Sequence, residues 1–358
     1  MGERSLSYSV TEKMKIAVLG CGAVGGVIAA CLTRSGHDVT PIVSNREIKA
    51  ALNEHGYRFG ESVSAETAIP LSYSAAANPE DAGSTFDIVI CATPSPTLEP
   101  ALRSIRPFLA PESIIVTCQN GLPEQRAVAI VGERVVGCVV GWGAAMREPG
   151  VYRRTSSGRL LVGKATPKCP PPEKLVSLLG AVSQVEVVAD LSAVRWSKLA
   201  INCVTSPFGA IGGEPLGVLL KYAGVRRLAL EVFGEVAEVA RFEGVQMRPV
   251  SGTLDIAAVA INAREKASRF ALSLLAKHVL LLAVGFKYRR MRSSMLYALE
   301  RGRPLEIEYL NGEIVRRGKR LGVATPISEG IIEAVRRIEG RKAPSSPATL
   351  RALSAQLT

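Results

Sequence analysis

Three glycines, Gly20, Gly22 and Gly25, form the pattern G-x-G-x-x-G, which can hold a pyrophosphate group against the protein backbone. The pattern follows an apolar run over residues 15–19, predicted as a buried strand, and opens a predicted helix that ends before Gly36. In this context the first glycine permits a tight turn, the second lets a phosphate approach, and the third lets helix and strand pack closely. The expected cofactor-binding residues here are Gly20, Cys21, Gly22, Ala23, Val24 and Gly25.

The second predicted strand, residues 38–43, ends without an acidic residue. A carboxylate at this place would hold the ribose 2′-hydroxyl of NAD. Instead, Ser44 and Asn45 can donate hydrogen bonds, and Arg46 can pair with the 2′-phosphate of NADP. The sequence therefore favours NADP, with Ser44 and Arg46 as cofactor-binding residues. A solvated arginine at the start of a helix is the alternative interpretation of Arg46.

Lys198, Asn202 and Ser206 form a polar line at helical spacing on an otherwise apolar stretch. Such a line, just past a nucleotide-binding domain, is compatible with the lining of a cleft between domains. From the pattern alone, a solvent-exposed helix face is favoured over that interpretation.

Strands and helices alternate from residue 15 to Gly141, which predicts a parallel sheet with helices on both faces. Pro94 and Asn120 follow predicted strands, at the sheet edge where such folds bind ligands. Antiparallel strands are expected after Gly141, and nearly every segment from Ala189 onward is predicted helical. The expected class is α/β, an N-terminal Rossmann-type doubly wound sheet followed by an all-α C-terminal domain.

Four segments are predicted from these patterns and from composition. They are a disordered extension (1–13), an NADP-binding domain (14–189), a helical substrate and dimerisation domain (190–341) and a disordered tail (342–358). Residues 1–13 lack the apolar core of a signal peptide, and Met14 is an alternative start.

The overall composition is that of an ordinary globular chain, with 358 residues, 47% of them hydrophobic and 21% charged. A net charge of +12 suits anionic partners, but no basic motif with interleaved aromatic residues supports nucleic-acid binding. The seven cysteines have no metal-binding spacing, so no metal site is expected, and they suggest a reducing compartment, the cytoplasm. The apolar stretch Phe270–Phe286 is interrupted by Lys277 and His278, which argues against a membrane span. We expect this stretch to be buried between two copies of a homodimer.

The chain resembles the 2-dehydropantoate 2-reductase (ketopantoate reductase) family from about Lys15 to about Ile331. Of five motifs, the first, with the glycines, is shared by many dehydrogenases, whereas the last three, in this order, are specific to the family. The motifs that carry the resemblance are Val18–Gly25, Gln119–Gly121, Lys198–Asn202, Ser293–Leu296 and Gly302–Gly312.

The resemblance implies NADPH-dependent reduction of ketopantoate to pantoate, a step in pantothenate and coenzyme A biosynthesis. Lys198 matches the family's general acid, which protonates the carbonyl oxygen as hydride arrives, and Glu306 matches an acid that holds the substrate near the lysine. A lysine ammonium is suited to this role, because hydride addition builds negative charge on the carbonyl oxygen. The remaining matches are Asn120 beside nicotinamide and substrate, Asn202 on a substrate hydroxyl, and Ser294 on the substrate.

Three residues depart from the family pattern, Pro94, Ser206 and Ala298, where the family has a lysine, an asparagine and often an aspartate. Ser206 is kept as a substrate-binding candidate. Reduction of another 2-oxo acid therefore stays open, as does a non-catalytic NADP-binding sensor. The sequence does not distinguish Glu306 from a surface acid such as Glu308, and a helix-capping role is an equal alternative for Ser294.

Overall fold

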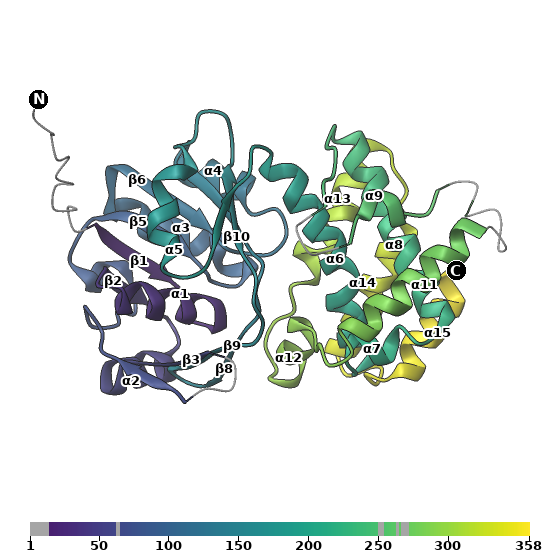
Figure 1. The fold of residues 1–358 in the computed structure, drawn as a ribbon, viewed down its shortest axis with the longest axis horizontal. Coiled ribbons are helices and arrows are strands. Elements are labelled where there is room, and N and C mark those ends of the chain that lie inside the picture. The colour runs from purple at the N-terminus through teal and green to yellow at the C-terminus, as the bar shows by residue number, and fades with distance from the viewer. Residues whose placement is uncertain (1–13, 62–64, 250–253, 263–264, 266–271) are drawn as a thin grey trace, which may run out of the picture. The chain divides into compact units, whose positions relative to one another are not determined.

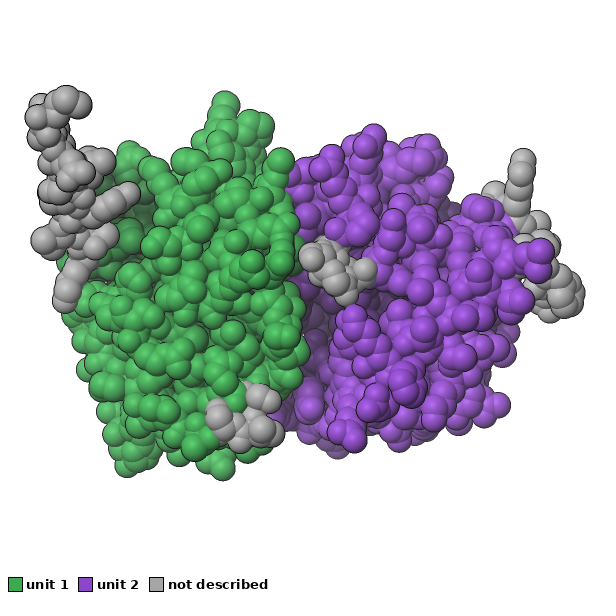
Figure 2. All heavy atoms as spheres, in the orientation of Figure 1, with its two compact units in different colours: residues 1–119, 123–189 green, residues 120–122, 190–358 purple. Residues whose placement is uncertain are grey.

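A computed structural model describes residues 14–61, 65–249, 254–262, 265 and 272–358. The predicted extension over residues 1–13 lies outside the described residues. The chain divides into two compact units, which are coloured separately in Figure 2. Unit 1 contains residues 1–119 and 123–189, and unit 2 contains residues 120–122 and 190–358.

Unit 1 is built on a seven-stranded sheet in the order β11-β10-β7-β6-β5-β1-β2 (Figure 1). Neighbouring strands are parallel except β10, which runs antiparallel to β7. The strands are β1 (Lys15–Leu19), β2 (Asp38–Ile42), β5 (Phe86–Cys91), β6 (Leu109–Thr117), β7 (Val135–Val140), β10 (Leu160–Lys164) and β11 (Val185–Val187).

Both faces of this sheet are covered, which explains why its strands are continuous apolar runs. Ile16 and Val18 of β1 belong to one hydrophobic cluster, and Ala17 and Leu19 belong to another on the opposite face. Helices α1 and α5 contribute to the first cluster, and α3 and α4 contribute to the second. The predicted doubly wound sheet is therefore confirmed. The helices are α1 (Ala23–Arg34), α2 (Arg46–His55), α3 (Leu98–Ile105), α4 (Glu124–Val131) and α5 (Val176–Gly180).

A second, four-stranded sheet in the order β4-β3-β9-β8 completes unit 1. Residues 143–154, predicted as antiparallel strands, form the β8–β9 hairpin of this sheet. Tyr152 of β9 is fully buried and lies in the same cluster as α1. The strands are β3 (Tyr57–Glu61), β4 (Thr67–Ile69), β8 (Ala144–Glu148) and β9 (Val151–Arg154).

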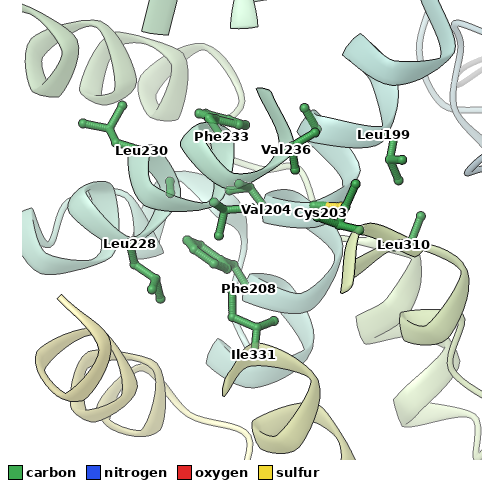
Figure 3. Close-up of a cluster of buried hydrophobic side chains, with 14 of the residues drawn as sticks. Leu199, Cys203, Val204, Phe208, Leu228, Leu230, Phe233, Val236, Leu310 and Ile331 are labelled. Carbon is green, nitrogen blue, oxygen red and sulfur yellow. The ribbon is translucent and has the colours of Figure 1, made fainter. Parts of the chain in front are cut away.

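Unit 2 is helical, as predicted, and α6 (Leu191–Gly212) forms much of its core. Leu199, Cys203 and Phe208 of α6 meet Leu228 and Ile331 from other helices in one cluster (Figure 3). The other helices described are α7 (Leu216–Leu219), α8 (Ala223–Phe242), α9 (Ile256–Val259), α11 (Leu272–Lys287), α12 (Ser294–Glu300), α13 (Asn311–Leu321), α14 (Pro326–Glu339) and α15 (Pro347–Leu357), with the 3₁₀ turn η5 (Ile307–Tyr309).

The prediction of a disordered tail from residue 342 is wrong, because α15 packs against α6, α8 and α14. Ser346 caps this helix by accepting from the Thr349 backbone N–H at 3.2 Å, and Pro347 occupies its first turn. Leu350 is fully buried. The Ser- and Pro-rich composition that suggested disorder is in fact the start signal of a helix with a buried apolar face.

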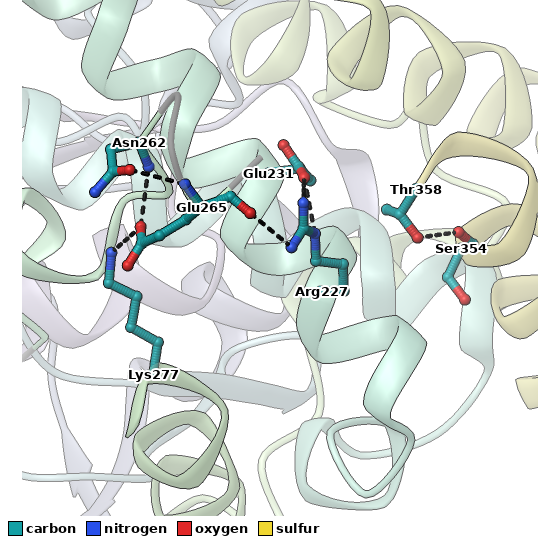
Figure 4. Close-up of polar contacts among 7 residues, drawn as sticks. All are labelled: Arg227, Glu231, Asn262, Glu265, Lys277, Ser354 and Thr358. Atoms are coloured by element: carbon teal, nitrogen blue, oxygen red, sulfur yellow. Dashed lines mark hydrogen bonds and ion pairs between the residues drawn. The ribbon is translucent and has the colours of Figure 1, made fainter. Parts of the chain in front are cut away.

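Helix α11 has only one buried face, formed by Leu274, Leu281 and Gly285. On this side, Lys277 Nζ donates to the Glu265 carboxylate at 2.6 Å (Figure 4). The opposite face of α11 carries large apolar side chains that are exposed in the single chain. No helix in the described part of the chain combines the length and apolar character needed to cross a bilayer.

Candidate active site

The glycine motif turns the chain from β1 into α1. Gly20 has φ of +86°, a conformation that L side chains rarely adopt, and this confirms its predicted role in a tight turn. A Cβ on Gly25 would lie 1.9 Å from the Gly20 carbonyl oxygen, so only glycine fits. The predicted close packing at the third glycine of the motif is therefore confirmed.

Gly22 is different, because a Cβ there would meet nothing within 4 Å. It is the N-cap of α1, no side chain caps this helix end, and the first turn carries no acidic residue. At the N-terminus of this 12-residue helix, the backbone N–H groups of the first turn point out of the helix and the helix dipole is positive. Both features favour binding of a pyrophosphate. Ala23 and Val24, the first helical residues, are half-buried.

Cys21 takes part in this turn through its backbone. Burial raises the pKa of its thiol to about 12, so the side chain stays protonated at neutral pH. Its carbonyl accepts a hydrogen bond from the Tyr152 hydroxyl at 2.8 Å. The Tyr152 ring also fills the space beside Gly26, where a Cβ would lie 2.0 Å from the ring. Sequence reasoning missed this support, although the Gly25-Gly26 pair was a usable signal of a close approach.

The end of β2 lies beside the glycine turn, since the Gly20 N–H donates to the Ile42 carbonyl at 2.9 Å. Ser44, Asn45 and Arg46 follow and are all exposed. Asn45 caps α2 by accepting from the Ile48 backbone N–H at 3.0 Å, which occupies its side-chain oxygen. Arg46 is the first residue of α2, so its exposed guanidinium is available to a ligand beside the turn.

Asn120 belongs to unit 2, although it follows a strand of unit 1. Its neighbour Gly121 has φ of +81°, and a Cβ there would lie 2.5 Å from the Tyr309 carbonyl oxygen. Tyr309 ends the 3₁₀ turn η5, whose N-cap is Glu306. The loop that carries Asn120 is thus packed against the segment that carries Glu306.

The polar line on α6 is not a solvent-exposed face. Lys198 and Asn202 are half-buried, and Ser206 is buried. The solvated-face interpretation of these residues is therefore wrong. It failed because unit 2 packs other helices around nearly the whole of α6, which periodicity along one helix does not reveal.

Two hydrogen bonds fix the end of α6 that carries Ser206. The Ser293 hydroxyl donates to the Ser206 carbonyl at 3.1 Å, and it lies 2.3 Å from the position that a Cβ on Gly209 would take. Asn311 Nδ2 donates to the Cys203 carbonyl at 3.1 Å. Pro207, four residues after Cys203, has no N–H to donate there, so Asn311 replaces the missing helical bond. Sequence reasoning missed Asn311, and the proline inside a predicted helix was the available signal.

The structure shows which residue of the serine pair caps α12. Ser293, not Ser294, caps α12, because its hydroxyl accepts from the Leu296 backbone N–H at 3.1 Å. Ser294 is the first helical residue and is exposed. The capping interpretation of Ser294 is therefore wrong, and its hydroxyl is accessible to a ligand.

The two acids of the last motif are both half-buried. Glu308 is engaged in an ion pair with Arg336, with 2.6 Å between Oε1 and Nη2. Glu306 is the N-cap of η5. The choice of Glu306 over Glu308 as the substrate-binding acid therefore stays a prediction from the motif match.

Two departures from the family pattern have local structural roles. Pro94 is exposed, and its carbonyl accepts from the Thr97 hydroxyl at 2.9 Å in the turn after β5. Ala298 packs on the core of unit 2, and its carbonyl accepts from the backbone N–H groups of Arg301 and Arg303. Among the described residues, no group of three or more His, Cys, Asp or Glu side chains could hold a metal ion.

Comparisons with known proteins find matches over most of this chain. A family model described as "Ketopantoate reductase PanE/ApbA" matches residues 16–167, and one described as "Ketopantoate reductase PanE/ApbA C terminal" matches residues 190–339. A 2-dehydropantoate 2-reductase of Mesorhizobium japonicum is 27% identical, covering 91% of this chain and 98% of its own length. That of Pyrococcus horikoshii is 26% identical and covers 88% and 94%.

Solved structures match the fold over most of this chain. A PanE/ApbA family ketopantoate reductase from Ralstonia eutropha JMP134 gives a TM-score of 0.76 at 27% identity, over 92% of this chain and 99% of that one. D-mandelate dehydrogenase with NADH and anilino(oxo)acetate gives the same TM-score at 22% identity and the same coverage, which is a likeness of fold.

Proposed function

Because the chain belongs to the ketopantoate reductase PanE/ApbA family, whose members are oxidoreductases acting on a CH–OH group, we propose that it reduces 2-dehydropantoate to pantoate with NADPH. The observation that carries this proposal is that the two family models together match parts of both units. The reaction would serve pantothenate and coenzyme A biosynthesis.

The family uses a nicotinamide cofactor, and the residues proposed to hold the phosphates of NADP lie in unit 1. Gly22 leaves room for the pyrophosphate against the start of α1, between Gly20 and Gly25. Exposed Arg46 and Ser44 at the end of β2 would hold the 2′-phosphate, which supports NADP over NAD. When bound, the reduced cofactor supplies the hydride.

Lys198 is proposed as the general acid. Hydride addition to the 2-oxo carbon leaves negative charge on the former carbonyl oxygen, and the Lys198 ammonium would stabilise and then protonate it. Glu306 would hold the substrate near the lysine. Asn120, Asn202, Ser206 and exposed Ser294 are proposed to orient the substrate by hydrogen bonds, Asn120 also touching the nicotinamide.

Reduction of a different 2-oxo acid on the same scaffold is the second candidate. It is favoured by Pro94, Ser206 and Ala298, which replace polar side chains of the family pattern by smaller or apolar ones. A relative in Bacillus subtilis, the uncharacterized oxidoreductase YkpB, is 27% identical over 92% of this chain. A non-catalytic NADP sensor is less well supported, because Lys198, Asn202 and Glu306 are all present.

We propose two further properties of the enzyme. A homodimer is supported by the exposed apolar face of α11, which a single chain leaves in solvent. A cytoplasmic location is supported by the seven cysteines, none of which forms a disulfide in the part of the chain that the structure describes; six of them are buried.

The test is a substrate panel that follows loss of NADPH absorbance with ketopantoate, other branched and straight 2-oxo acids, and an aromatic 2-oxo acid. The proposal predicts the highest kcat/KM with ketopantoate. A higher value with another 2-oxo acid supports the second candidate, and no oxidation of NADPH with any of them supports the sensor.

A further inference from the structure

Gln119 is the buried first residue of the Gln119–Gly121 motif. Its side chain is 4% exposed, and it follows the end of β6 by two residues. Its Nε2 atom donates to the Thr93 carbonyl at 3.1 Å and to the Thr93 hydroxyl at 3.4 Å. A buried side-chain amide therefore connects the end of β6 to the loop that follows β5.

The loop after β5 also packs on the glycine turn. A Cβ on Gly20 would lie 2.9 Å from both the Cα and the Cγ2 atoms of Thr93. Just before it, the Ala92 N–H donates to the Leu19 carbonyl at 2.9 Å, which continues the pairing of β5 with β1. Thr93 thus lies against the turn that is proposed to hold the pyrophosphate.

Two further carbonyl groups of this loop accept hydrogen bonds from side chains. The Pro94 carbonyl accepts from the Thr97 hydroxyl at 2.9 Å, and the Ser95 carbonyl accepts from Arg126 Nη1 of α4 at 3.2 Å. Each of the three consecutive carbonyl groups of residues 93–95 is therefore held by a side chain. These bonds restrict the backbone of the loop, although Pro94 itself is exposed.

The strand order places this loop between the two ends of the proposed cofactor site. In the sheet, β5 lies between β1 and β6 and is parallel to both. The proposed pyrophosphate ligands follow β1, and Asn120, proposed to touch the nicotinamide, follows β6. Parallel strands carry their ligands at the carboxyl edge of the sheet. Residues that hold one dinucleotide at both of these places would therefore place it across the end of β5.

We propose that Gln119 is a positioning residue for hydride transfer, because it holds the Thr93 carbonyl and thereby fixes the loop of residues 93–95 at the end of β5. This rests on the reductase function proposed above. Gln119 acts in this role through the loop and not by contact with the reacting atoms. The reacting atoms must come within about 3–3.5 Å, and a misplacement of about 1 Å can lower the rate about 100-fold.

Gln119→Met tests the role, because it removes the donor and keeps the length of the side chain. It should lower kcat with the best 2-oxo acid by about 10- to 100-fold. The dissociation constant of NADPH, measured by calorimetric titration, should change less than about threefold, since the proposed phosphate ligands are not part of the hydrogen bond. Gln356→Met, the same change at an exposed position of α15, is the control and should leave both quantities unchanged. Equal losses of kcat and NADPH affinity in Gln119→Met would overturn the positioning role.

Gln119→Glu separates the hydrogen bond from simple packing, because only a protonated carboxyl group can donate to the Thr93 carbonyl. Burial and the facing carbonyl both disfavour the ionised form, so the pKa of the new carboxyl should lie above the usual value of about 4.3. The ratio of its kcat to that of the wild type should therefore rise as the pH is lowered from about 8 to about 5. The same ratio for Gln119→Met should stay flat. Ionisations that both proteins share, such as that of Lys198, cancel in the ratio, and a flat ratio for Gln119→Glu would overturn the hydrogen bond.

A third measurement needs neither cofactor nor substrate. Amide hydrogen exchange over residues 92–97 should be about tenfold faster in Gln119→Met than in the wild type, because the loop opens more readily. Exchange over β1 and α1 should be unchanged, which shows that unit 1 stays folded. Unchanged exchange in the loop would overturn the proposal, as would wild-type kcat in a variant whose loop exchanges faster.

The same measurement separates this proposal from the proposed function. If the wild type oxidises NADPH with no 2-oxo acid while Gln119→Met still exchanges faster over residues 92–97, the reductase function fails and the role of Gln119 in holding the loop stands. If the wild type is active and Gln119→Met keeps its full kcat, the reductase function stands and the positioning role fails.

Discussion

Asn311 donates to the Cys203 carbonyl at 3.1 Å, in the one helical turn of α6 where Pro207 removes the donor that the helix would supply. Asn311 is fully buried and lies five residues after Glu306. The hydrogen bond therefore ties the segment of Glu306 to the turn of α6 that follows Asn202. It replaces a lost backbone bond and fixes the register between two segments that carry proposed substrate-binding residues.

Asn311→Ala should lower the free energy of unfolding of unit 2 by about 1–3 kcal/mol, because it leaves the buried Cys203 carbonyl unpaired. Denaturant unfolding followed by Trp196 fluorescence, in a Trp142→Phe background, measures this unit alone, since the chain has only these two tryptophans.

Pro207→Ala provides the matched control. It restores an N–H four residues after Cys203, so Asn311→Ala should cost less in that background. Equal losses with and without the proline would show that the Cys203 carbonyl is not what Asn311 supports.

Two glycines of the motif should respond differently to alanine. Gly25→Ala should destabilise unit 1 by about 1–3 kcal/mol, because its Cβ collides with the Gly20 carbonyl. Gly22→Ala has open space and an ordinary φ of −71°, so folding should be nearly unchanged. NADPH affinity should nevertheless fall about tenfold or more, because the methyl group occupies the place of the pyrophosphate. Unfolding curves and calorimetric titration with NADPH separate the two effects, and unchanged affinity in Gly22→Ala would contradict the phosphate site.

Arg46→Ala should remove the preference for NADPH over NADH. A guanidinium–phosphate hydrogen bond contributes about 1.5–3 kcal/mol, a factor of roughly 10 to 100 in affinity. NADH affinity should stay the same, since NADH has no 2′-phosphate. Arg103→Ala, an exposed arginine on α3, is the control and should leave both affinities unchanged. Wild type with equal affinity for both cofactors would disprove the assignment.

Lys198→Ala should lower kcat by a factor of about 10² to 10⁴, the usual contribution of a positioned general acid. NADPH affinity should barely change, because the proposed phosphate ligands lie in unit 1. Steady-state rates with the best substrate and NADPH titration give the two quantities, and Lys221→Ala, an exposed lysine of unit 2, serves as the control. Near wild-type turnover in Lys198→Ala would rule it out as the acid.

Glu306→Ala should chiefly raise KM for the substrate, with a smaller loss of kcat, because it is assigned to hold the substrate. Glu308→Ala should leave KM unchanged and affect only stability, since Glu308 is paired with Arg336. Rates at varied substrate concentration distinguish them. A larger KM effect at Glu308 than at Glu306 would reverse the assignment.

The sequence by itself determined the fold class and the cofactor turn. Both depend on a local pattern, in which a buried strand is followed by glycines and an amphipathic helix. This pattern extends over only about thirty residues of sequence. The roles of Gly20 and Gly25 follow from backbone sterics that any strand–turn–helix shares, so they were predictable before any tertiary contact was known.

Only the tertiary structure decided the burial, the helix capping and the ion-pair partners of residues in and around the proposed substrate site. That Lys198 is half-buried, that Ser293 rather than Ser294 caps α12, and that Glu308 has Arg336 as a partner depend on packing between distant segments. The pairing of Asn311 with Cys203 spans 108 residues, and no periodicity along the chain encodes it. The order of the tail and the exposed apolar face of α11 were decided in the same way, because burial is a property of which helices meet and not of any one helix.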